Sequence, residues 1–183
     1  MVDRIILHCD LNNFFASVSL LYNPTLKDLP VAVCGDSENR HGIILAKNNI
    51  AKSFGVKTAE AIFEAKRKCP NLVTLPPLYD EYEKYSKKAR QIYERYTDMV
   101  EPFGIDECWL DVTGSTVLFG DGLEIANKIR RDIKRELGIT ISVGVSFNKI
   151  FAKLGSDYKK PDATTVITPD NFKQILFPLD VGD

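Results

Sequence analysis

Three carboxylates of this chain lie where predicted strands begin or end. Asp10 closes an apolar run, residues 5–9, while Asp106 and Glu107 lie where one short strand turns back into the next. Carboxylate oxygens are the ligands that Mg²⁺ takes in proteins, and this cation is usually shared between a few carboxylates and the phosphates of a substrate. The three side chains therefore point to the chemistry of phosphoryl transfer.

The elements that must position these carboxylates follow from hydrophobic periodicity and turn residues. Strands are predicted at residues 5–10, 31–34, 42–46, 73–75, 99–103, 108–112, 140–146 and 165–167. Helices are predicted at residues 12–21, 48–54, 59–68, 79–99, 122–137, 149–158 and 169–176. Thr168 is expected to cap the last helix, because a proline follows it at the first helical position.

The order of these elements predicts an α+β fold with sheet and helices in two layers. Without residues 14–78, which form a small inserted α/β subdomain, the order is that of the ferredoxin-like split β-α-β-β-α-β arrangement. In this topology the first and third strands are antiparallel neighbours at the centre of the sheet. Asp10 should therefore lie beside Asp106 and Glu107.

Composition sets broad limits on the class of protein. The 183 residues allow one substantial domain or a domain with a subdomain, and 44% hydrophobic and 27% charged residues are ordinary for a globular chain. No apolar run approaches the roughly 20 residues that cross a bilayer, and residues 1–4 lack the regions of a signal peptide. We therefore expect a cytoplasmic protein without a membrane partner. The net charge of −1 decides nothing about nucleic acid.

The cysteines and histidines give no sign of a zinc site. The four cysteines are widely spaced, without a C-x-x-C pair, and His8 and His41 do not cluster with them. The cysteines are Cys9, Cys34, Cys69 and Cys108. We expect structural free thiols, because Cys9 and Cys108 lie in apolar strand runs where cysteine behaves as a small buried hydrophobe.

If the three carboxylates meet, they can hold two divalent ions about 3.5–4 Å apart. Such a pair activates an attacking hydroxyl and stabilises the leaving oxygen of an in-line displacement. Asp10 and Asp106 would bridge both ions, and Glu107 would bind the ion nearest the nucleophile. The alternative is that each acid is a solvated turn residue without a ligand.

Five motifs resemble those of the Y-family translesion DNA polymerases and follow one another through nearly the whole chain. They are Asp10-x-x-x-Phe14-Phe15-Ala16, Phe54-Gly55-Val56, Ile105-Asp106-Glu107-x-x-Leu110-Asp111, Ser142-Val143-Gly144-Val145-Ser146-x-Asn148-Lys149 and Ala152-Lys153-Leu154. The resemblance implies a palm of residues 1–13 and 79–167, fingers of residues 14–78, and the start of a truncated thumb in residues 168–183.

The resemblance also implies an activity, its cofactors and its partners. The activity is template-directed transfer of a deoxynucleotidyl group from a dNTP to a primer 3′-hydroxyl during bypass of DNA damage. Two Mg²⁺ ions, for which Mn²⁺ is a possible substitute, are the implied cofactors, and primer–template DNA is the implied partner. Leu11 joins Asp10, Asp106 and Glu107 in the implied metal site.

Six residues are implied to bind the nucleotide: Asn13, Phe14, Phe15, Asn49, Lys52 and Lys160. Phe15 matches the steric gate, an aromatic ring under the sugar that excludes a 2′-hydroxyl. Apart from the resemblance, a phenylalanine of the core is an equally good interpretation of this residue. Lys160 matches the palm lysine that contacts the triphosphate, and its alternative is an exposed lysine in a polar turn. The backbone amides of residues 11–14 are expected to hold phosphate oxygens, because amides just past a strand end are often unpaired.

The fingers depart from the commonest family pattern, Thr-Ala-Asn-Tyr-x-x-Arg, and read Ala46-Lys47-Asn48-Asn49-Ile50-Ala51-Lys52 instead. Ala46 replaces the threonine, Asn49 the tyrosine and Lys52 the arginine, which makes the segment more similar to the polymerase V branch. Lys52 keeps the positive charge but lacks the bidentate fork of arginine.

The end of the chain bears on activity. The sequence stops at Asp183, where the family's thumb would continue. We therefore expect a catalytic-core fragment that is weakly active or inactive by itself. A sliding clamp would bind through regions outside this chain.

Three other functions stay open from the sequence. A nucleotide cyclase uses a similar sheet with paired carboxylates, although its usual loop signatures are absent here. An RNA-binding module of this topology reads bases with strand aromatics, and the candidates are few: Phe103, Trp109 and Phe147. A catalytically silent relative is kept open by the altered fingers.

Overall fold

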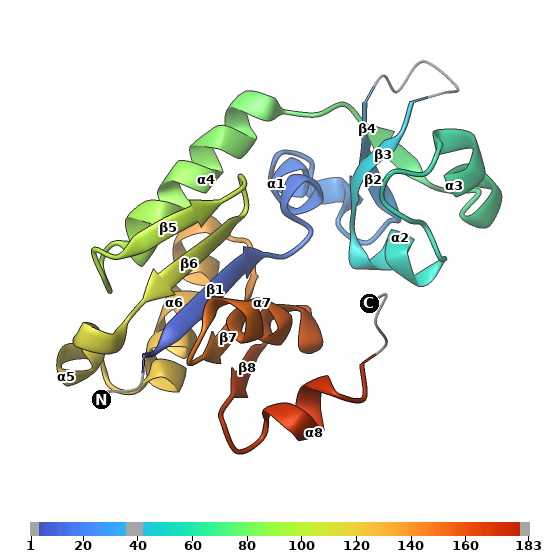
Figure 1. Cartoon of the computed structure of the whole chain (residues 1–183). Helices are drawn as coiled ribbons and strands as arrows, with labels where there is room; N and C mark the ends of the chain where they lie inside the picture. Colours follow the sequence, from blue (N-terminus) through green and yellow to red (C-terminus); the bar gives the residue numbers. More distant parts are fainter. Residues whose placement is uncertain (1–3, 36–41, 180–183) are drawn as a thin grey trace. The chain divides into compact units, whose positions relative to one another are not determined.

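Two β-sheets contain the strands of this chain. The computed structural model describes residues 4–35 and 42–179, and has a five-stranded sheet of order β5-β6-β1-β7-β8 and a three-stranded sheet of order β3-β2-β4 (Figure 1). The chain divides into two compact units, one up to Asn12 and from Ser86 onward, the other from Asn13 to Tyr85. Each unit contains one of the sheets.

The first unit contains the five-stranded sheet and most of the helices. Its strands are β1 (Ile6–Leu11), β5 (Val100–Phe103), β6 (Glu107–Asp111), β7 (Ile141–Ser146) and β8 (Thr164–Ile167). Its helices are the later part of α4 (Tyr79–Tyr93), α5 (Thr116–Phe119), α6 (Gly122–Leu137), α7 (Lys149–Tyr158) and α8 (Phe172–Leu176).

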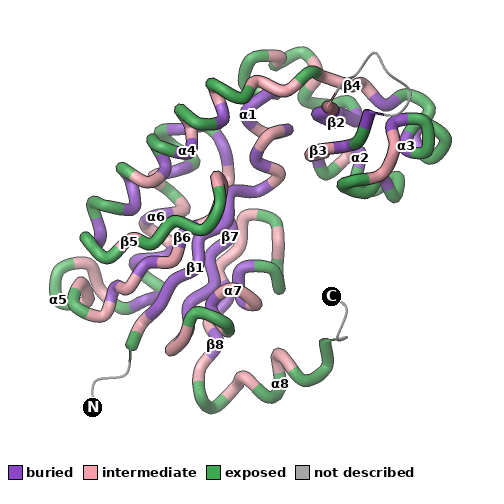
Figure 2. The backbone as a smooth tube through the Cα atoms, turned by 45° about the horizontal axis from the view of Figure 1, so that its top comes forward, coloured by how far each residue is buried: buried purple, intermediate pink, exposed green. Residues whose placement is uncertain are grey.

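Strand pairing in this sheet confirms the ferredoxin-like prediction. β1 pairs antiparallel with both β6 and β7, β5 pairs antiparallel with β6, and β8 is added in parallel to β7. Every residue of β1 and β7 is buried, as expected for central strands (Figure 2). The edge strand β5 is mostly exposed.

Helix α6 shows how local sequence fixes an element. Asp121 and Glu124 form a reciprocal capping box at its start, and Gly138, with φ of 70°, ends it in the left-handed conformation. Ile125, Ile129 and Ile133 repeat on one face and are fully buried. Burial of each isoleucine contributes about 1.5–3 kcal/mol. The amphipathic face, rather than helix propensity, therefore holds α6 on the sheet.

Helix α7 lies on the opposite face of the sheet from α6 (Figure 1), and it approaches β7 unusually closely. A Cβ atom added at Gly144 of β7 would lie 1.8 Å from the Ala152 carbonyl oxygen of α7. A Cβ at Gly155 would lie 3.1 Å from the Gly144 Cα. The two glycines thus allow helix and strand backbones to touch.

The second unit is a small α/β structure. Its elements are α1 (Phe14–Tyr22), β2 (Val31–Cys34), β3 (Ile44–Lys47), α2 (Asn49–Ser53), α3 (Ile62–Lys68), β4 (Val73–Leu75) and the first residues of α4. β2 pairs antiparallel with β3 and parallel with β4. Small and aliphatic side chains, among them Ala32, Ile44 and Ala65, form its buried core.

Three helix boundaries differ from the predictions by three residues or more, and one of them is the start of α3, which lies at Ile62 rather than Ala59. Helix α4 ends at Tyr93 rather than Met99, because Thr97 leaves the helical path: its hydroxyl donates to the Asp111 carbonyl at 2.7 Å and accepts from the Met99 amide. Helix α8 begins at Phe172 rather than directly after Thr168. Residues 169–171 instead form a turn.

Two further findings concern cysteines and membrane spans. All four cysteines are free and buried, which confirms the predicted structural thiols. Across residues 4–35 and 42–179, no helix combines the length and apolar character needed to cross a bilayer. His41 lies outside the described residues.

Candidate metal centre

The three predicted carboxylates lie at one end of the central strand pair. Asp10 and Glu107 are direct partners in the register of β1 and β6, and the Leu11 amide donates to the Asp106 carbonyl at 3.0 Å. Topology alone brings these residues together, so the predicted juxtaposition is confirmed. The antiparallel order works as expected because β1 ends where β6 begins.

The turn between β5 and β6 is held from helix α4. Gly104, with φ of 78°, makes the turn possible. The Ser86 hydroxyl donates to the Ile105 carbonyl, and the Arg90 guanidinium donates to the Gly104 carbonyl at 3.3 Å. Asp106 therefore follows a turn whose two preceding carbonyls are fixed by side chains.

Asp10 is almost fully buried, at 7% exposure, and pairs with Lys160. The Lys160 ammonium donates to Asp10 Oδ2 at 2.5 Å and lies 2.7 Å from Asp157. Burial raises the pKa of Asp10 to about 7, against the opposing effect of Lys160, and the neighbouring Glu107 adds to the rise. The site therefore favours any cation that neutralises Asp10.

Glu107 and Asp106 share the same environment. The Lys153 ammonium of α7 donates to Glu107 Oε1 at 2.8 Å. Burial raises the pKa of Asp106, and so does the nearby Glu107. Within the described ranges, no three acidic, histidine or cysteine side chains are already arranged around a cation position. The two lysines instead provide the counter-charges.

The donor set itself fits a hard divalent cation. Asp10, Asp106 and Glu107 offer carboxylate oxygens only, which suit Mg²⁺ and Mn²⁺ rather than a soft metal. Burial first, and crowding with Glu107 second, raise the pKa values of Asp10 and Asp106. A cation would relieve this crowding.

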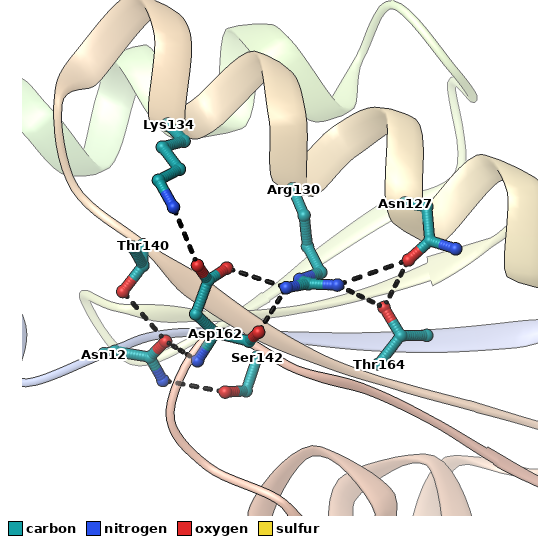
Figure 3. A network of polar contacts seen from close by, with 8 residues as sticks. All are labelled: Asn12, Asn127, Arg130, Lys134, Thr140, Ser142, Asp162 and Thr164. Carbon is teal, nitrogen blue, oxygen red and sulfur yellow. Dashed lines mark hydrogen bonds and ion pairs between the residues drawn. The ribbon is translucent and has the colours of Figure 1, made fainter.

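A polar network fixes the turn that carries Lys160 (Figure 3). Asn12, directly after β1, accepts from the Asp162 amide at 2.8 Å and from the Thr140 hydroxyl, and donates to Ser142 at 2.9 Å. The members of the network are Asn12, Asn127, Arg130, Lys134, Thr140, Ser142, Asp162 and Thr164. Because Asp162 follows Lys160 by two residues, the network sets where the lysine can reach.

Asp162 connects this network to α6. Its carboxylate accepts from Arg130 at 2.8 Å and from Lys134 at 3.0 Å. Burial alone would raise the pKa of Asp162, but the hydrogen bonds and charges of these two cations hold it below its ordinary value. Arg130 also reaches Thr164 and Asn127.

The structure corrects the expectation about backbone amides. The Leu11 amide is bonded to the Asp106 carbonyl and the Asn12 amide to the Thr140 carbonyl at 2.9 Å. These two donors are taken by neighbouring segments, so the prediction that they hold phosphate is wrong. The prediction stands untested for Asn13 and Phe14. The metal role predicted for Leu11 also stays a prediction.

In the second unit, two predicted nucleotide residues meet. Asn13, in the left-handed conformation with φ of 49°, donates from its side chain to the Asn49 side-chain oxygen at 3.0 Å. Lys52 lies exposed on α2, one turn after Asn49. Asn48 has a structural role, because its side chain caps α2 and bonds to Val31 and Leu29.

Phe15 is the more exposed of the two adjacent phenylalanines on α1. Phe14 is buried, whereas Phe15 is half-buried and stacks on Tyr82, with ring centroids 4.2 Å apart and planes 9° apart. The Tyr82 hydroxyl in turn bonds to Ser19 at 2.7 Å. The stack gives Phe15 a fixed ring with one face supported. Its gate role stays a prediction.

Three residues near the carboxylates escaped the sequence reasoning about sites. The sequence presents Lys153 only as part of a motif and Asn12 only as a helix residue. It presents His8 only as a possible partner of the cysteines. The contacts of these three residues join segments far apart in the chain, up to 150 positions for Asn12 and Asp162. The one signal in the sequence is that His8 lies two residues before Asp10 in a predicted strand, so both side chains belong to the same face of the sheet.

Comparison with known proteins gives close relatives. DNA polymerase IV of Acetivibrio thermocellus is 66% identical over 178 residues, which are 97% of this chain and 45% of that protein. DNA polymerase IV 1 of Bacillus subtilis is 42% identical over 180 residues, 98% of this chain and 43% of that protein. The chain therefore spans about half the length of these relatives.

Solved structures agree in fold. The insertion ternary complex of Dbh DNA polymerase matches with a TM-score of 0.88 and 33% identity, over 97% of this chain and 52% of that one. DinB from Sulfolobus solfataricus matches with a TM-score of 0.89 and 34% identity, over the same shares.

The family profile settles the relationship. It is that of the impB/mucB/samB family, and it matches residues 9–157, which are more than half of the chain. The matched range contains all three carboxylates, the end of β1 and the whole of β2, β6 and β7. This chain therefore belongs to the impB/mucB/samB family, and its resemblance to the Y-family polymerases is confirmed.

Proposed function

We propose that this chain supplies the catalytic part of a translesion DNA polymerase, which adds deoxynucleotides to a primer 3′-hydroxyl on a template. The observation that carries the proposal is the meeting of Asp10, Asp106 and Glu107 at one end of adjacent strands. Lys153 and Lys160 accompany them. Relatives that carry the name DNA polymerase IV support it.

Asp10, Asp106 and Glu107 are the proposed ligands of two Mg²⁺ or Mn²⁺ ions, with Leu11 as a further member of the site. When bound, such ions activate the attacking hydroxyl and stabilise the leaving oxygen of the in-line displacement. The three carboxylates determine where the ions would bind, and they supply the negative charge that attracts them. Asp10 is buried and Asp106 and Glu107 are half-buried, which limits the access of competing water to the reacting groups.

Lys160 is proposed to contact the triphosphate. Its ammonium is now shared between Asp10 and Asp157. A triphosphate offers more negative charge than either carboxylate, so we expect Lys160 to turn toward it and release Asp10 for a cation. The Asn12 network would keep the lysine backbone in place during this change.

The remaining roles rest on the family resemblance. Asn13, Phe14, Asn49 and Lys52 are proposed to bind the nucleotide, and Phe15 to exclude the 2′-hydroxyl. Palm, fingers and the start of a thumb are the proposed identities of residues 1–13 with 79–167, of 14–78 and of 168–183, although residues 180–183 lie outside the described part. Binding of primer–template DNA, contact with a sliding clamp through other regions, and cytoplasmic residence are proposed on the same basis.

The test is primer extension by the natural protein that contains this chain, with and without Mg²⁺. Asp106→Asn should lower extension on the order of 10³-fold while the thermal midpoint stays near that of the parent, because a ligand is lost but the turn is kept. Glu94→Gln, which changes an exposed acid just after α4, is the control. Near-normal extension by Asp106→Asn would refute the metal role.

The same assay separates the rival functions. A labelled nucleotide that becomes cyclic without a primer would identify a cyclase. Binding of primer–template DNA without extension, in the parent protein with Mg²⁺ present, would identify a catalytically silent relative.

A further inference from the structure

His8 is a fully buried histidine of β1 whose function no motif explains. It lies two residues before Asp10, on the same face of the strand, beneath α7. Its Nδ1 atom lies 2.8 Å from the Ser156 hydroxyl of α7, and its ring lies 5.3 Å from the Trp109 ring. The imidazole therefore has one firm hydrogen bond and little freedom to turn.

The other ring nitrogen of His8 points at the carboxylate cluster. Nε2 is buried and has no hydrogen-bond partner among the described residues, and it lies 3.9 Å from Glu107 Oε2. A buried polar atom without a partner costs free energy, so one that persists beside a functional group calls for an explanation.

The position of the protons follows from Ser156. Its oxygen lies 2.8 Å from His8 Nδ1 and 2.7 Å from the Lys153 carbonyl oxygen, but its hydroxyl has one proton to donate. If the proton goes to Lys153, a neutral His8 must present the lone pair of Nε2 to the Glu107 carboxylate. If it goes to Nδ1, then Nε2 carries a hydrogen and faces an acceptor.

The second arrangement turns a hydrogen of His8 Nε2 toward the Glu107 carboxylate, at the expense of the Ser156 bond to the Lys153 carbonyl. The Lys153 carbonyl lies inside α7, where the helix supplies its own donor, so it loses little. Glu107 then has a different donor toward each oxygen: Lys153 at 2.8 Å on Oε1, and His8 Nε2 toward Oε2. A side-chain shift of about 1 Å would close the second contact to hydrogen-bond length.

We propose that His8 is a positioning residue that acts through Glu107, with its Nε2–H directing the carboxylate into the orientation in which it binds a divalent cation. The proposal rests on the proposed function of Glu107. His8 suits the task better than Lys153 does. Lys153 holds its charge on a flexible stem and can follow Glu107, whereas the packed ring of His8 cannot.

A matched pair of amides tests the proposal in the natural protein that contains this chain. In His8→Gln the side-chain nitrogen reaches the position of Nε2, whereas in His8→Asn it reaches only that of Nδ1. Mn²⁺ binding, measured by electron paramagnetic resonance on the DNA complex without nucleotide, should weaken about 10–100-fold in His8→Asn and stay within about threefold of the parent in His8→Gln.

The Mg²⁺ concentration for half-maximal extension should rise in the same ratio in His8→Asn, while the KM for the dNTP changes alike in both variants. Equal metal binding by the two variants would overturn the proposal, because a packing role does not distinguish the two nitrogens. If the variants do not fold, the ¹⁵N shifts of His8 in the parent protein decide: a protonated Nε2 supports the proposal, and an unprotonated one overturns it.

Failure of this inference and failure of the proposed function give different results. A parent protein that binds no Mn²⁺, or an Asp106→Asn variant that extends normally, would remove the metal site itself. A parent that binds Mn²⁺ and loses extension on Asp106→Asn, while His8→Asn behaves as the parent, would remove only the role of His8.

Discussion

The acidic end of the first sheet and the α1–α2 region of the second unit differ in how tightly their side chains are fixed. At the acidic end, Asp10 and Glu107 are held by lysine partners and by strand register. In the α1–α2 region, Asn49 and Lys52 are exposed on a five-residue helix. The proposed metal ligands are thus determined by many contacts, and Asn49 and Lys52, which are proposed to bind the nucleotide, by few.

The comparison has a physical meaning for mutation. A change that removes a paired side chain at the acidic end disturbs partners on several strands and helices, so its effects on stability and activity should be linked, whereas the isosteric change Asp106→Asn keeps the packing. A change at an exposed residue of the α1–α2 region, such as Lys52, should alter what the protein binds with little effect on folding. Substitutions in the two regions therefore test this difference.

Phe15→Ala should lower discrimination against ribonucleotides on the order of 10²-fold, because the ring proposed to exclude the 2′-hydroxyl is removed. Incorporation of a ribonucleotide against its deoxynucleotide counterpart measures this effect. Tyr82→Leu, which removes the ring stacked on Phe15, should give a smaller loss in the same direction. Unchanged sugar selection by Phe15→Ala would remove the gate assignment.

Arg130→Met should lower the free energy of unfolding by about 1–3 kcal/mol, because Asp162 loses its ion pair with Arg130 in a partly buried network. Urea denaturation measures it. Extension should fall as well, since the turn carrying Lys160 is loosened. Arg95→Met, which breaks a more exposed pair with Glu136, should lower stability much less than Arg130→Met does and leave extension unchanged. Equal effects of the two changes would contradict the comparison.

Lys52→Arg should lower the KM for the incoming nucleotide a few-fold, because a guanidinium can bind two phosphate oxygens at once. Lys52→Ala should raise it, and neither variant should change the thermal midpoint by more than about 2 °C. Lys57→Ala, an exposed lysine of the same unit, is the control. If Lys52→Ala binds nucleotide as the parent does, Lys52 is a surface lysine.

Acid should remove the contribution of Asp162. Its pKa in the folded protein lies below the ordinary value, so its stabilising effect is present above the unfolded pKa of about 3.9 and is lost as pH falls through the folded value. The difference in thermal midpoint between the parent and Asp162→Asn should therefore be larger at pH 7 than at pH 3. A difference that does not change with pH would mean that the charge of Asp162 adds nothing.

Sequence reasoning reached the fold and the carboxylates for one reason. Element order and hydrophobic period are local signals, and the ferredoxin-like topology converts them into a three-dimensional neighbourhood. Helices α6 and α7 begin and end as predicted because their limits depend on adjacent residues such as Asp121, Gly138 and Asn148. The meeting of Asp10 with Glu107 needed nothing more than strand order.

The surroundings of the carboxylates could not be predicted in the same way. Whether the Asn12 amide is free depends on Thr140, a neighbour supplied by a different segment. Lys153 contacts Glu107, and Ser156 contacts His8. Both contacts depend on how α7 packs on the sheet. Such contacts follow from packing, and residue types and spacing alone do not predict each of them.

The glycine contact between β7 and α7 has a consequence for how this domain can change. Lys153 and Ser156 follow Ala152 on the same helix, so the backbone contact at Gly144 sets how far their side chains stand from the cluster. Any side chain at position 144 would lift the helix and withdraw both donors at once. A mutational scan should therefore find that position 144 tolerates glycine alone. Variants with altered metal preference should arise at other positions.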